Sequence, residues 1–210
     1  MTLKVLGIST SPRSESSSDE LLRKALAGAE STGANTEYLR LVNFSVSPCV
    51  ECNSCYKTGT CRIQDDYQVI LARMLEADRL IFATPIFFMS VCTQAKILID
   101  RCQCLWARKY VLGQPLFPDG PRDRRAMVIA VGGSKSKKMF ECVKWTMKYF
   151  LEMLEMRYFS NLFINQVEDL SKILEHSNAV EEAFRLGAEL VTSDTTPEKP
   201  TDVELTRTNS

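Results

Sequence analysis

Four cysteines crowd one short stretch of the chain. The stretch reads C-x2-C-x2-C-x5-C, with its thiols at Cys49, Cys52, Cys55 and Cys61. Thiols that recur every third residue can surround a compact inorganic core, because an iron–sulfur cube offers several metal atoms to neighbouring sulfurs. Gly59 gives the backbone a point where φ can be positive, which lets Cys61 return to the same site. The spacing predicts a [4Fe–4S] cluster in a binding loop over residues 47–62.

Four clustered thiols could also bind zinc or form disulfides. Structural zinc also takes four cysteines, but usually as two pairs separated by a longer spacer. Disulfides belong to oxidising compartments, and the apolar start of this sequence is too short for a signal peptide and has no processing site. The spacing therefore favours the cluster, and zinc is the alternative.

A second group of polar residues lies near the start of the chain. A β-rich run over residues 3–9 is followed by a hydroxyl-rich loop, and then by apolar residues at helical spacing over 19–30. Helix N-termini bind anions through free N–H groups and the positive end of the helix dipole. No dinucleotide-binding or P-loop glycine motif is present, so a terminal monophosphate is the predicted ligand. The predicted contacts are Ser9, Ser11, Arg13, Ser16, Ser17 and Ser18. The alternative is a serine-rich loop that only caps the helix.

Strands and helices alternate along the chain. Strands are predicted over residues 3–9, 34–42, 79–83, 125–131 and 156–164. Helices are predicted over residues 19–30, from 65 or 66 onward, and over 92–106, 137–153, 169–175 and 179–191. This order predicts an α/β fold, a doubly wound parallel sheet of five strands with helices on both faces.

Unusual loops follow four of these strands. The loop over residues 84–91 is apolar and aromatic, and Gly132 and Gly133 follow the fourth strand. The cysteine loop follows the second strand, and the hydroxyl-rich loop follows the first. In open parallel sheets, ligands bind beyond the carboxyl ends of the strands. All four loops are therefore expected at one edge of the sheet.

Length and composition narrow the class of protein. The 210 residues fit a single domain over 1–192, followed by a polar, flexible tail over 193–210. Lys and Arg total 26 and Asp and Glu total 26, so no overall field attracts nucleic acid or an acidic membrane. No apolar stretch approaches the ~20 residues that span a bilayer. A cytoplasmic protein is expected. The connection over 106–124 is long enough to be a lid or an oligomer contact.

Several remaining residues have simpler interpretations. Four cysteines in predicted helices are expected in the core, because free cysteine is usually buried: Cys92, Cys102, Cys104 and Cys142. Cys102 and Cys104 cannot share one face of a continuous helix, which argues against a paired role. His176 is expected at the surface or at a helix cap.

Two motifs resemble those of a known family. The run Ile8-Ser9-Thr10-Ser11-Pro12-Arg13 resembles the phosphate loop of the NADPH-dependent FMN reductase-like flavoproteins. The run from Ala83 to Phe88, with Lys96 and Asp100-Arg101, resembles their second motif. With the cysteine run added, the chain is similar to the iron–sulfur flavoproteins of anaerobic archaea and bacteria. The resemblance covers roughly the first two-thirds of the chain, and the cysteine run is its most specific part.

The resemblance implies a flavodoxin-like fold with strand order 2-1-3-4-5, one FMN and one [4Fe–4S] cluster. It also implies a homodimer or homotetramer in which a cluster faces the flavin of a neighbouring chain. The phosphate would lie on the serine-rich loop. The isoalloxazine would lie against Pro85, Ile86, Phe87, Phe88, Met89 and Ser90, with Gly132 and Gly133 at its far edge.

These features predict an electron-transfer flavoprotein that relays electrons between a redox protein such as ferredoxin and an acceptor. One alternative is an NAD(P)H-dependent oxidoreductase of the FMN or quinone type, in which flavin does the chemistry and the cysteines are accessory. A second alternative is a zinc-stabilised flavodoxin-like binding protein without turnover.

Overall fold

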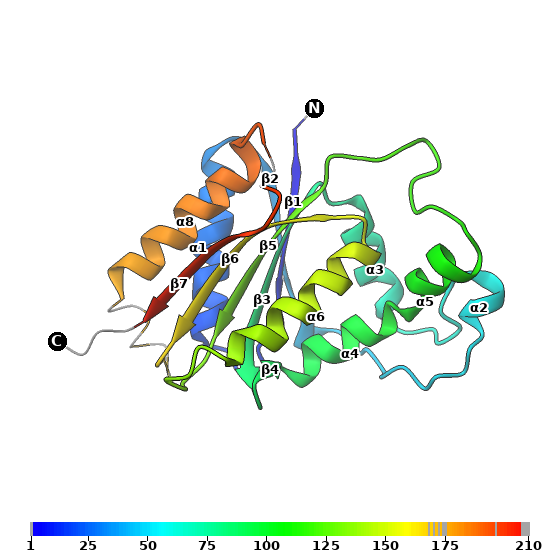
Figure 1. Cartoon of the computed structure of the whole chain (residues 1–210), viewed down its shortest axis with the longest axis horizontal. Coiled ribbons are helices and arrows are strands. Elements are labelled where there is room, and N and C mark those ends of the chain that lie inside the picture. Colours follow the sequence, from blue (N-terminus) through cyan, green and yellow to red (C-terminus); the bar gives the residue numbers. More distant parts are fainter. Residues whose placement is uncertain are drawn as a thin grey trace.

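A parallel sheet runs through the centre of the molecule (Figure 1). The computed structural model describes residues 2–167, 169, 171, 173, 176–195 and 197–206. The strand order is β2-β1-β3-β5-β6-β7, and the short strand β4 pairs antiparallel with the end of β3. The strands are β1 (Lys4–Ser9), β2 (Asn35–Arg40), β3 (Arg79–Phe87), β4 (Ser90–Val91), β5 (Arg125–Val131), β6 (Arg157–Asn165) and β7 (Thr201–Thr206).

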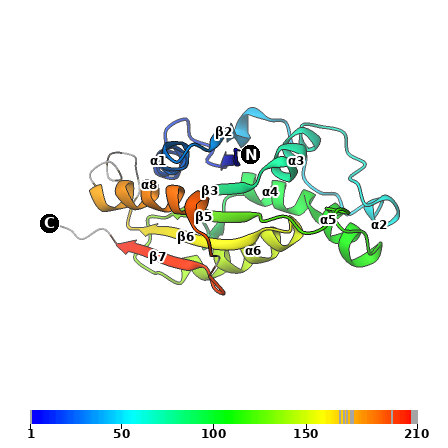
Figure 2. The same cartoon turned by 90° about the horizontal axis from the view of Figure 1, so that it is seen from above.

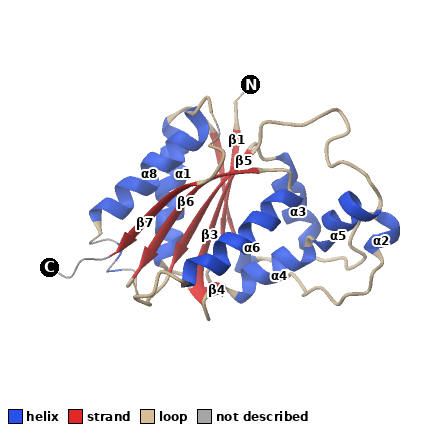
Figure 3. Ribbon diagram, in the orientation of Figure 1, coloured by secondary structure: helices blue, strands red, loops and turns tan. Residues whose placement is uncertain are grey.

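Helices cover both faces of the sheet (Figures 2 and 3). They are α1 (Ser17–Ser31), α2 (Cys55–Thr58), α3 (Tyr67–Glu76), α4 (Thr93–Arg101), α5 (Gln103–Trp106), α6 (Met139–Met153) and α8 (Ser177–Thr192), with the short turns η1 (Leu41–Asn43) and η2 (Ala107–Val111). One apolar core joins α1 and α8 to the sheet, and the other joins α3, α4 and α6 to its opposite face. No helix within the described residues has the length and apolar composition needed to cross a membrane.

The predicted fold class is confirmed. The five predicted strands correspond to β1, β2, β3, β5 and β6, and they lie in the predicted order 2-1-3-4-5. All of their mutual pairings are parallel. The helix predicted over residues 169–175 includes residues outside the described part of the chain.

The C-terminal segment differs from the predicted flexible tail. Residues 201–206 form β7, which pairs parallel with the open edge of β6. Val203 and Leu205 pack against the α1–α8 core, while Lys144 forms ion pairs with Asp202 and Glu204 on the alternate positions. Apolar and charged residues alternate over only a few positions here, which is too short a pattern to predict a strand from the sequence. The pairing of β7 also depends on the free edge of β6. The last four residues of the predicted tail lie outside the described residues.

The third strand is longer than predicted. β3 continues to Phe87 and turns back through β4, with Ile86 opposite Val91 and Phe87 opposite Ser90. The expected loop over 84–91 is therefore a hairpin. Its two turn residues, Phe88 and Met89, both have positive φ, as two-residue hairpin turns of the I′ type require. Bulky residues are uncommon in this conformation, so the sequence did not predict a tight turn at Phe88 and Met89.

The helix predicted over 92–106 is broken. Cys102 ends α4 and begins α5, so the chain bends there. The sulfurs of Cys102 and Cys104 consequently lie 3.6 and 3.2 Å from the Tyr67 hydroxyl oxygen. The argument that the two thiols cannot act as a pair assumed a continuous helix and is wrong. Cys92 is buried as expected, whereas Cys142 is exposed on α6, which corrects its placement in the core.

Helices α1 and α8 approach each other through two glycines. A Cβ added to Gly28 would lie 2.0 Å from the Phe184 carbonyl oxygen, and one added to Gly187 would lie 2.0 Å from the Ala25 carbonyl oxygen. Real side chains do not make such contacts, so both positions need glycine for the two helix backbones to cross closely.

We predict that Gly28→Ala lowers the free energy of unfolding by about 1–3 kcal/mol, because the added methyl group forces α1 away from α8. Alanine is otherwise the better helix former by up to about 1 kcal/mol, so destabilisation would identify the clash as dominant. Urea unfolding measures the effect. Ala27→Ser on the exposed side of the same turn is the control and should change stability by less than about 0.5 kcal/mol. Equal stability of both variants would contradict the close crossing.

Candidate functional site

The cysteine loop leaves the sheet at the end of β2 and returns at α3. Glu51 and Asn53 both have positive φ, and these two left-handed residues flank Cys52. The short helix α2 then begins at Cys55 and ends at Gly59, whose φ of 71° confirms the predicted left-handed turn before Cys61. The local conformation therefore folds the four cysteines back on one another within a single loop.

Hydrogen bonds close the base of this loop, which we call the neck (residues 45–47 and 63–66). The Asp66 carboxylate accepts from the Ser45 amide at 2.6 Å, and the Asp65 carboxylate accepts from the Ser47 amide at 2.9 Å. In the reverse direction, the Asp66 amide donates to the Ser45 carbonyl oxygen at 3.2 Å. The two ends of the loop are thus joined before α3 begins.

Arg101 from α4 hydrogen bonds to both ends of the neck and is buried between them. Its side chain is fully buried, and Nη1 donates to the Asp65 carboxylate at 2.7 Å and to the Ser47 carbonyl at 2.8 Å. Nη2 donates to the Ile63 carbonyl at 3.1 Å. The guanidinium carbon lies 4.5 Å from the centre of the Tyr67 ring, a stacking contact that suits arginine. One side chain therefore binds both ends of the loop.

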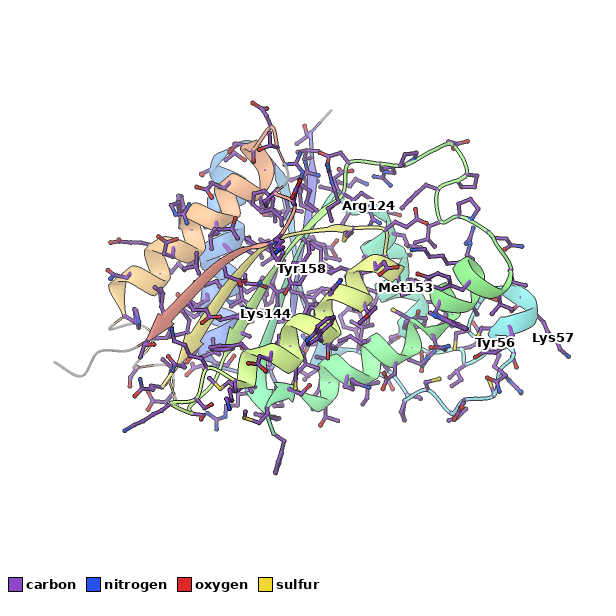
Figure 4. All side chains as sticks on the ribbon, viewed as in Figure 1. Tyr56, Lys57, Arg124, Lys144, Met153 and Tyr158 are labelled. Atoms are coloured by element: carbon purple, nitrogen blue, oxygen red, sulfur yellow. The ribbon has the colours of Figure 1, made fainter. Side chains whose placement is uncertain are left out.

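All four predicted cluster ligands line one cavity of about 910 Å³. Its other walls come from α4, α5, η2 and α6, and they are largely aromatic and apolar. Figure 4 labels Tyr56 and Met153, which line it from α2 and from the end of α6. Tyr56 also packs against Trp106, with ring centroids 5.9 Å apart, and Trp106 packs against Tyr110 at 5.7 Å. The tertiary structure thus gathers the sequence-predicted ligands and adds walls that the sequence did not identify.

The environment of the thiols differs from one to the next. Hydrogen bonds from the Ser54 backbone and side chain, with the charge of Arg62, lower the pKa of the exposed Cys52 thiol. Burial raises the pKa of Cys55, and the neighbouring thiols Cys49, Cys52 and Cys61 add to that shift. The thiolate is the form that binds metal, so Cys52 is more readily available as a ligand than Cys55.

The four thiols do not converge on one point. Within the part of the chain that the structure describes, no three His, Cys, Asp or Glu side chains are placed to hold a single metal ion. A tetrahedral zinc site needs all of its sulfurs about 2.3 Å from one ion. An iron–sulfur cluster is held by four cysteine thiolates, and the four thiols that line this cavity match that donor set.

Two buried thiols and a tyrosine lie directly beside this cavity. Burial raises the pKa of Cys102 to about 12 and also raises the pKa of Cys104, which lines the cavity. Burial likewise raises the pKa of the Tyr67 hydroxyl far above its ordinary range. These groups are neutral and do not compete as thiolates. The sequence did not predict this group of two thiols and a tyrosine, because no glycine or proline marks the helix break at Cys102.

The predicted phosphate loop lies between β1 and α1. Ser9, Thr10 and Ser11 are buried, residues 12–15 are exposed, and Ser16 is the N-cap of α1, accepting from the Asp19 amide at 3.2 Å. Within the described residues the buried Ser9 hydroxyl makes no hydrogen bond of normal geometry.

The four other predicted serine contacts already have hydrogen-bond partners within the chain. The Ser17 hydroxyl donates to the Asp169 carbonyl at 2.9 Å, and the Ser11 hydroxyl accepts from the Arg13 amide at 3.2 Å. The Ser16 and Ser18 hydroxyl oxygens lie 3.4 Å apart. The strand-loop-helix arrangement is therefore present, although Ser17 is turned toward residue 169 in this conformation.

The three segments predicted to contact FMN come together at the ends of β1, β3 and β5. Thr10 hydrogen bonds to the Ala83 carbonyl through both its amide and its hydroxyl, at 3.0 and 2.9 Å. The buried Cys92 thiol donates to the Thr10 carbonyl oxygen at 3.2 Å, which ties the first loop to the hairpin. A Cβ on Gly132 would lie 3.3 Å from the Ile86 Cβ, so the third segment packs against the hairpin.

The candidate cluster cavity and the predicted FMN segments are separate in this chain. None of the described residues that line the cavity belongs to the predicted FMN set. Figure 1 shows α2 and α5 beyond α4, away from the end of the sheet where β4 lies. The cysteine loop starts at the predicted edge, at the end of β2, but its neck binds to α4 and holds the four cysteines beside the helices.

Comparisons with known proteins agree with this fold. The model of the NADPH-dependent FMN reductase family matches residues 3–168. An iron–sulfur flavoprotein of Methanocaldococcus jannaschii is 35% identical over 149 residues, covering 71% of this chain and 72% of that protein. An iron–sulfur flavoprotein of Archaeoglobus fulgidus is 34% identical over 131 residues, covering 62% of this chain and 63% of that protein.

Solved structures extend the likeness to the whole fold. An NAD(P)H:quinone oxidoreductase from Methanothermobacter marburgensis superposes with a TM-score of 0.72 at 18% identity, covering 94% of this chain and all of that one. A flavone reductase superposes with a TM-score of 0.67 at 21% identity, covering 94% of this chain and 66% of the other. At these identities the likeness concerns the fold.

The fold and these comparisons together define a flavin oxidoreductase of the flavodoxin-like class. The chain belongs to the NADPH-dependent FMN reductase family, and within it to the iron–sulfur flavoproteins.

The neck provides a pH-dependent prediction. Burial would raise the pKa of Asp65, but hydrogen bonds from Arg101 and from the Ser47 and Tyr67 amides outweigh it and lower the pKa to about 2. Since the folded value lies below the ordinary 3.8, Asp65 stabilises the protein fully above that pH and progressively less as pH falls toward 2. We expect it to contribute on the order of 2 kcal/mol at neutral pH.

Thermal unfolding of the wild type and Asp65→Asn across this pH range measures that contribution. The variant should be less stable at neutral pH, and the difference between the two proteins should shrink as pH falls from about 3.8 to about 2. Glu15→Gln, at an exposed position of the first loop, is the control. A difference that does not change with pH would contradict the assignment.

Proposed function

We propose that this chain binds one FMN and one [4Fe–4S] cluster and relays electrons between a redox protein such as ferredoxin and an acceptor. The observation that carries the proposal is the cavity lined by Cys49, Cys52, Cys55 and Cys61. Sulfur is the donor that iron–sulfur clusters use, and the closed neck holds the four thiols in one loop. The similarity to proteins named iron–sulfur flavoproteins supports the same assignment.

The FMN assignment rests on three segments that meet beyond the sheet. The buried Ser9 hydroxyl and the N-terminus of α1 suit a phosphate, because a helix begins with amides that have no partner inside the helix. The hairpin at residues 85–90 offers apolar surface for a flat ring, with Phe87 and Met89 about half exposed and Phe88 fully exposed. Gly132 allows close approach beside Ile86.

Each of these residues has a binding or positioning role. The cysteines hold the cluster as thiolates, the serine-rich loop binds the phosphate, and Thr10 and Cys92 keep that loop against the hairpin. When bound, the cluster exchanges one electron at a time and the flavin exchanges one or two. No general acid or base is required from the chain for this exchange.

The separation of the two sites has a consequence for the relay. No residue of the cavity belongs to the predicted FMN set, so different surfaces of one chain would hold the cluster and the flavin. We therefore propose a homodimer or homotetramer that places the cluster cavity of one chain against the hairpin of another. Exposed aromatic and apolar side chains on both surfaces, including Tyr110 and Phe88, support such a contact.

Replacing one ligand tests the cluster assignment. In anaerobic protein, Cys52→Ser should lose the bound iron and acid-labile sulfide, because serine does not supply a thiolate, while FMN remains bound. Iron, sulfide and released flavin are measured together. Cys142→Ser, which removes an exposed thiol outside the loop, is the matched control and should keep all three. Full iron in Cys52→Ser would exclude the proposed ligand set.

An NAD(P)H-dependent oxidoreductase is the second candidate function, and the matched family model favours it specifically. The two candidates differ in their electron donor. Rapid bleaching of the flavin by NADPH would support direct two-electron reduction, whereas bleaching only by reduced ferredoxin would support the relay. Stopped-flow absorbance under anaerobic conditions measures both rates. The relay is rejected if NADPH reduces the flavin rapidly and the cluster-free variant is equally fast.

The same anaerobic preparation tests the zinc alternative. A zinc-stabilised binding protein should contain zinc and neither iron nor sulfide. Iron and sulfide near four per chain, with one FMN, are the contents expected for the proposed cofactors.

A further inference from the structure

Arg101 is the most deeply buried charge next to the cluster cavity. Its side chain is 0% exposed, and its partner Asp65 is 11% exposed. Placing a charged group in such surroundings costs free energy unless every donor finds a partner. Arg101 meets that condition only in part. Nη1 has two partners and Nη2 has one, but Nε makes no hydrogen bond of normal geometry within the described residues.

The unused donor belongs to a side chain that lines the cavity of the four thiols. Burial alone would lower the pKa of Arg101, but Asp65 and then Cys61 lie close enough to the guanidinium to raise that pKa. A cluster held by four thiolates carries net negative charge, and its sulfurs accept hydrogen bonds. A buried cation with a free N–H donor complements that group in both charge and hydrogen bonding.

We propose that Arg101 is the positioning residue of the cluster: it locks both ends of the cysteine loop and presents its remaining N–H donor and its charge to the Cys61 side of the cluster. The proposal rests on the cluster assignment made above. It gives this arginine a role that packing alone does not explain, since a helix-terminal residue on α4 has no need of a guanidinium that reaches Ser47, Ile63 and Asp65.

Arginine suits this role better than lysine would. Its rigid fork donates in several directions at once, so a single residue can bind two carbonyls, a carboxylate and a sulfur. A lysine at the same position would keep the positive charge but would lose the simultaneous contacts with both ends of the loop. The two functions of the side chain, fastening and charge, can therefore be separated by substitution.

The test compares Arg101→Gln, Arg101→Lys and the wild type in full-length anaerobic protein, with Lys57→Gln as the matched control. Lys57 is an exposed cation in the same loop (Figure 4), so its loss changes the charge without touching the neck. Amide hydrogen exchange over residues 44–66 is measured after iron has been removed with a chelator. This readout does not depend on a loaded cluster.

We expect exchange over residues 44–66 to be on the order of 100-fold faster in Arg101→Gln, because several hydrogen bonds from a charged donor are lost together. Exchange in α1 and α6 should stay at the wild-type rate, which checks that the rest of the chain is folded. Lys57→Gln should match the wild type throughout. Wild-type exchange in Arg101→Gln would overturn the fastening role.

The cluster midpoint potential separates charge from fastening. Loss of the positive charge disfavours the reduced, more negative cluster. Arg101→Gln should therefore lower the equilibrium constant for reduction about tenfold, which lowers the midpoint potential by about 59 mV for one electron. Arg101→Lys should retain most of the wild-type potential although its loop exchanges faster. Equal potentials in all three proteins would overturn the charge role.

Two further outcomes keep the test decisive. If Arg101→Gln holds no cluster while Lys57→Gln does, the positioning role is supported. The midpoint potential of Arg101→Lys is then compared with that of the wild type. If the wild type itself takes up no iron or sulfide, the proposed function fails, and the exchange data still decide separately whether Arg101 fastens the neck.

Discussion

The ion pair between Arg101 and Asp65 is the contact on which the candidate cluster site depends. It lies at the base of the cysteine loop, where both ends of a long excursion from the sheet must be brought together. Ordering a loop of this length costs conformational entropy, and packing offsets only part of it, because Cys55 and Cys61 pack against the core whereas Cys49 and Cys52 are exposed. A buried guanidinium that binds Ser47 and Ile63 at once supplies the compensating free energy at one point.

The position of the neck also determines where the loop goes. Because Arg101 lies at the end of α4, the loop is held beside α4 and α5 and away from the strand ends. The predicted FMN segments remain at the sheet edge, tied to one another through Thr10, Cys92 and Gly132. The fold thus provides two sites on different surfaces, and the proposed relay joins them through a second chain.

The remaining thiols show how the same side chain serves different purposes. Cys92 is a buried donor between two loops, and Cys102 and Cys104 face the Tyr67 hydroxyl. Burial keeps Cys102 and Cys104 protonated, whereas hydrogen bonds from Ser54 favour the thiolate of the exposed Cys52. His176 likewise has a local role, since it caps α8 by accepting from the Ala179 amide, as its position next to a predicted helix suggested.

The sequence by itself determined the alternation of five strands with helices, the placement of the hydroxyl-rich loop before α1, the left-handed turn at Gly59 and the set of four clustered cysteines. Those features follow from local periodicity, from backbone chemistry and from spacing, all of which act within a few residues. Only the tertiary structure decided that β7 completes the sheet, that α4 breaks at Cys102 and that Arg101 closes the cysteine loop. Each of those involves a partner far away in the chain: β7 pairs with the free edge of β6, the break brings two thiols to the Tyr67 hydroxyl, and Arg101 binds the carbonyl groups at the neck. Contacts of that kind arise from burial and complementary hydrogen bonding in three dimensions, and no local pattern encodes them.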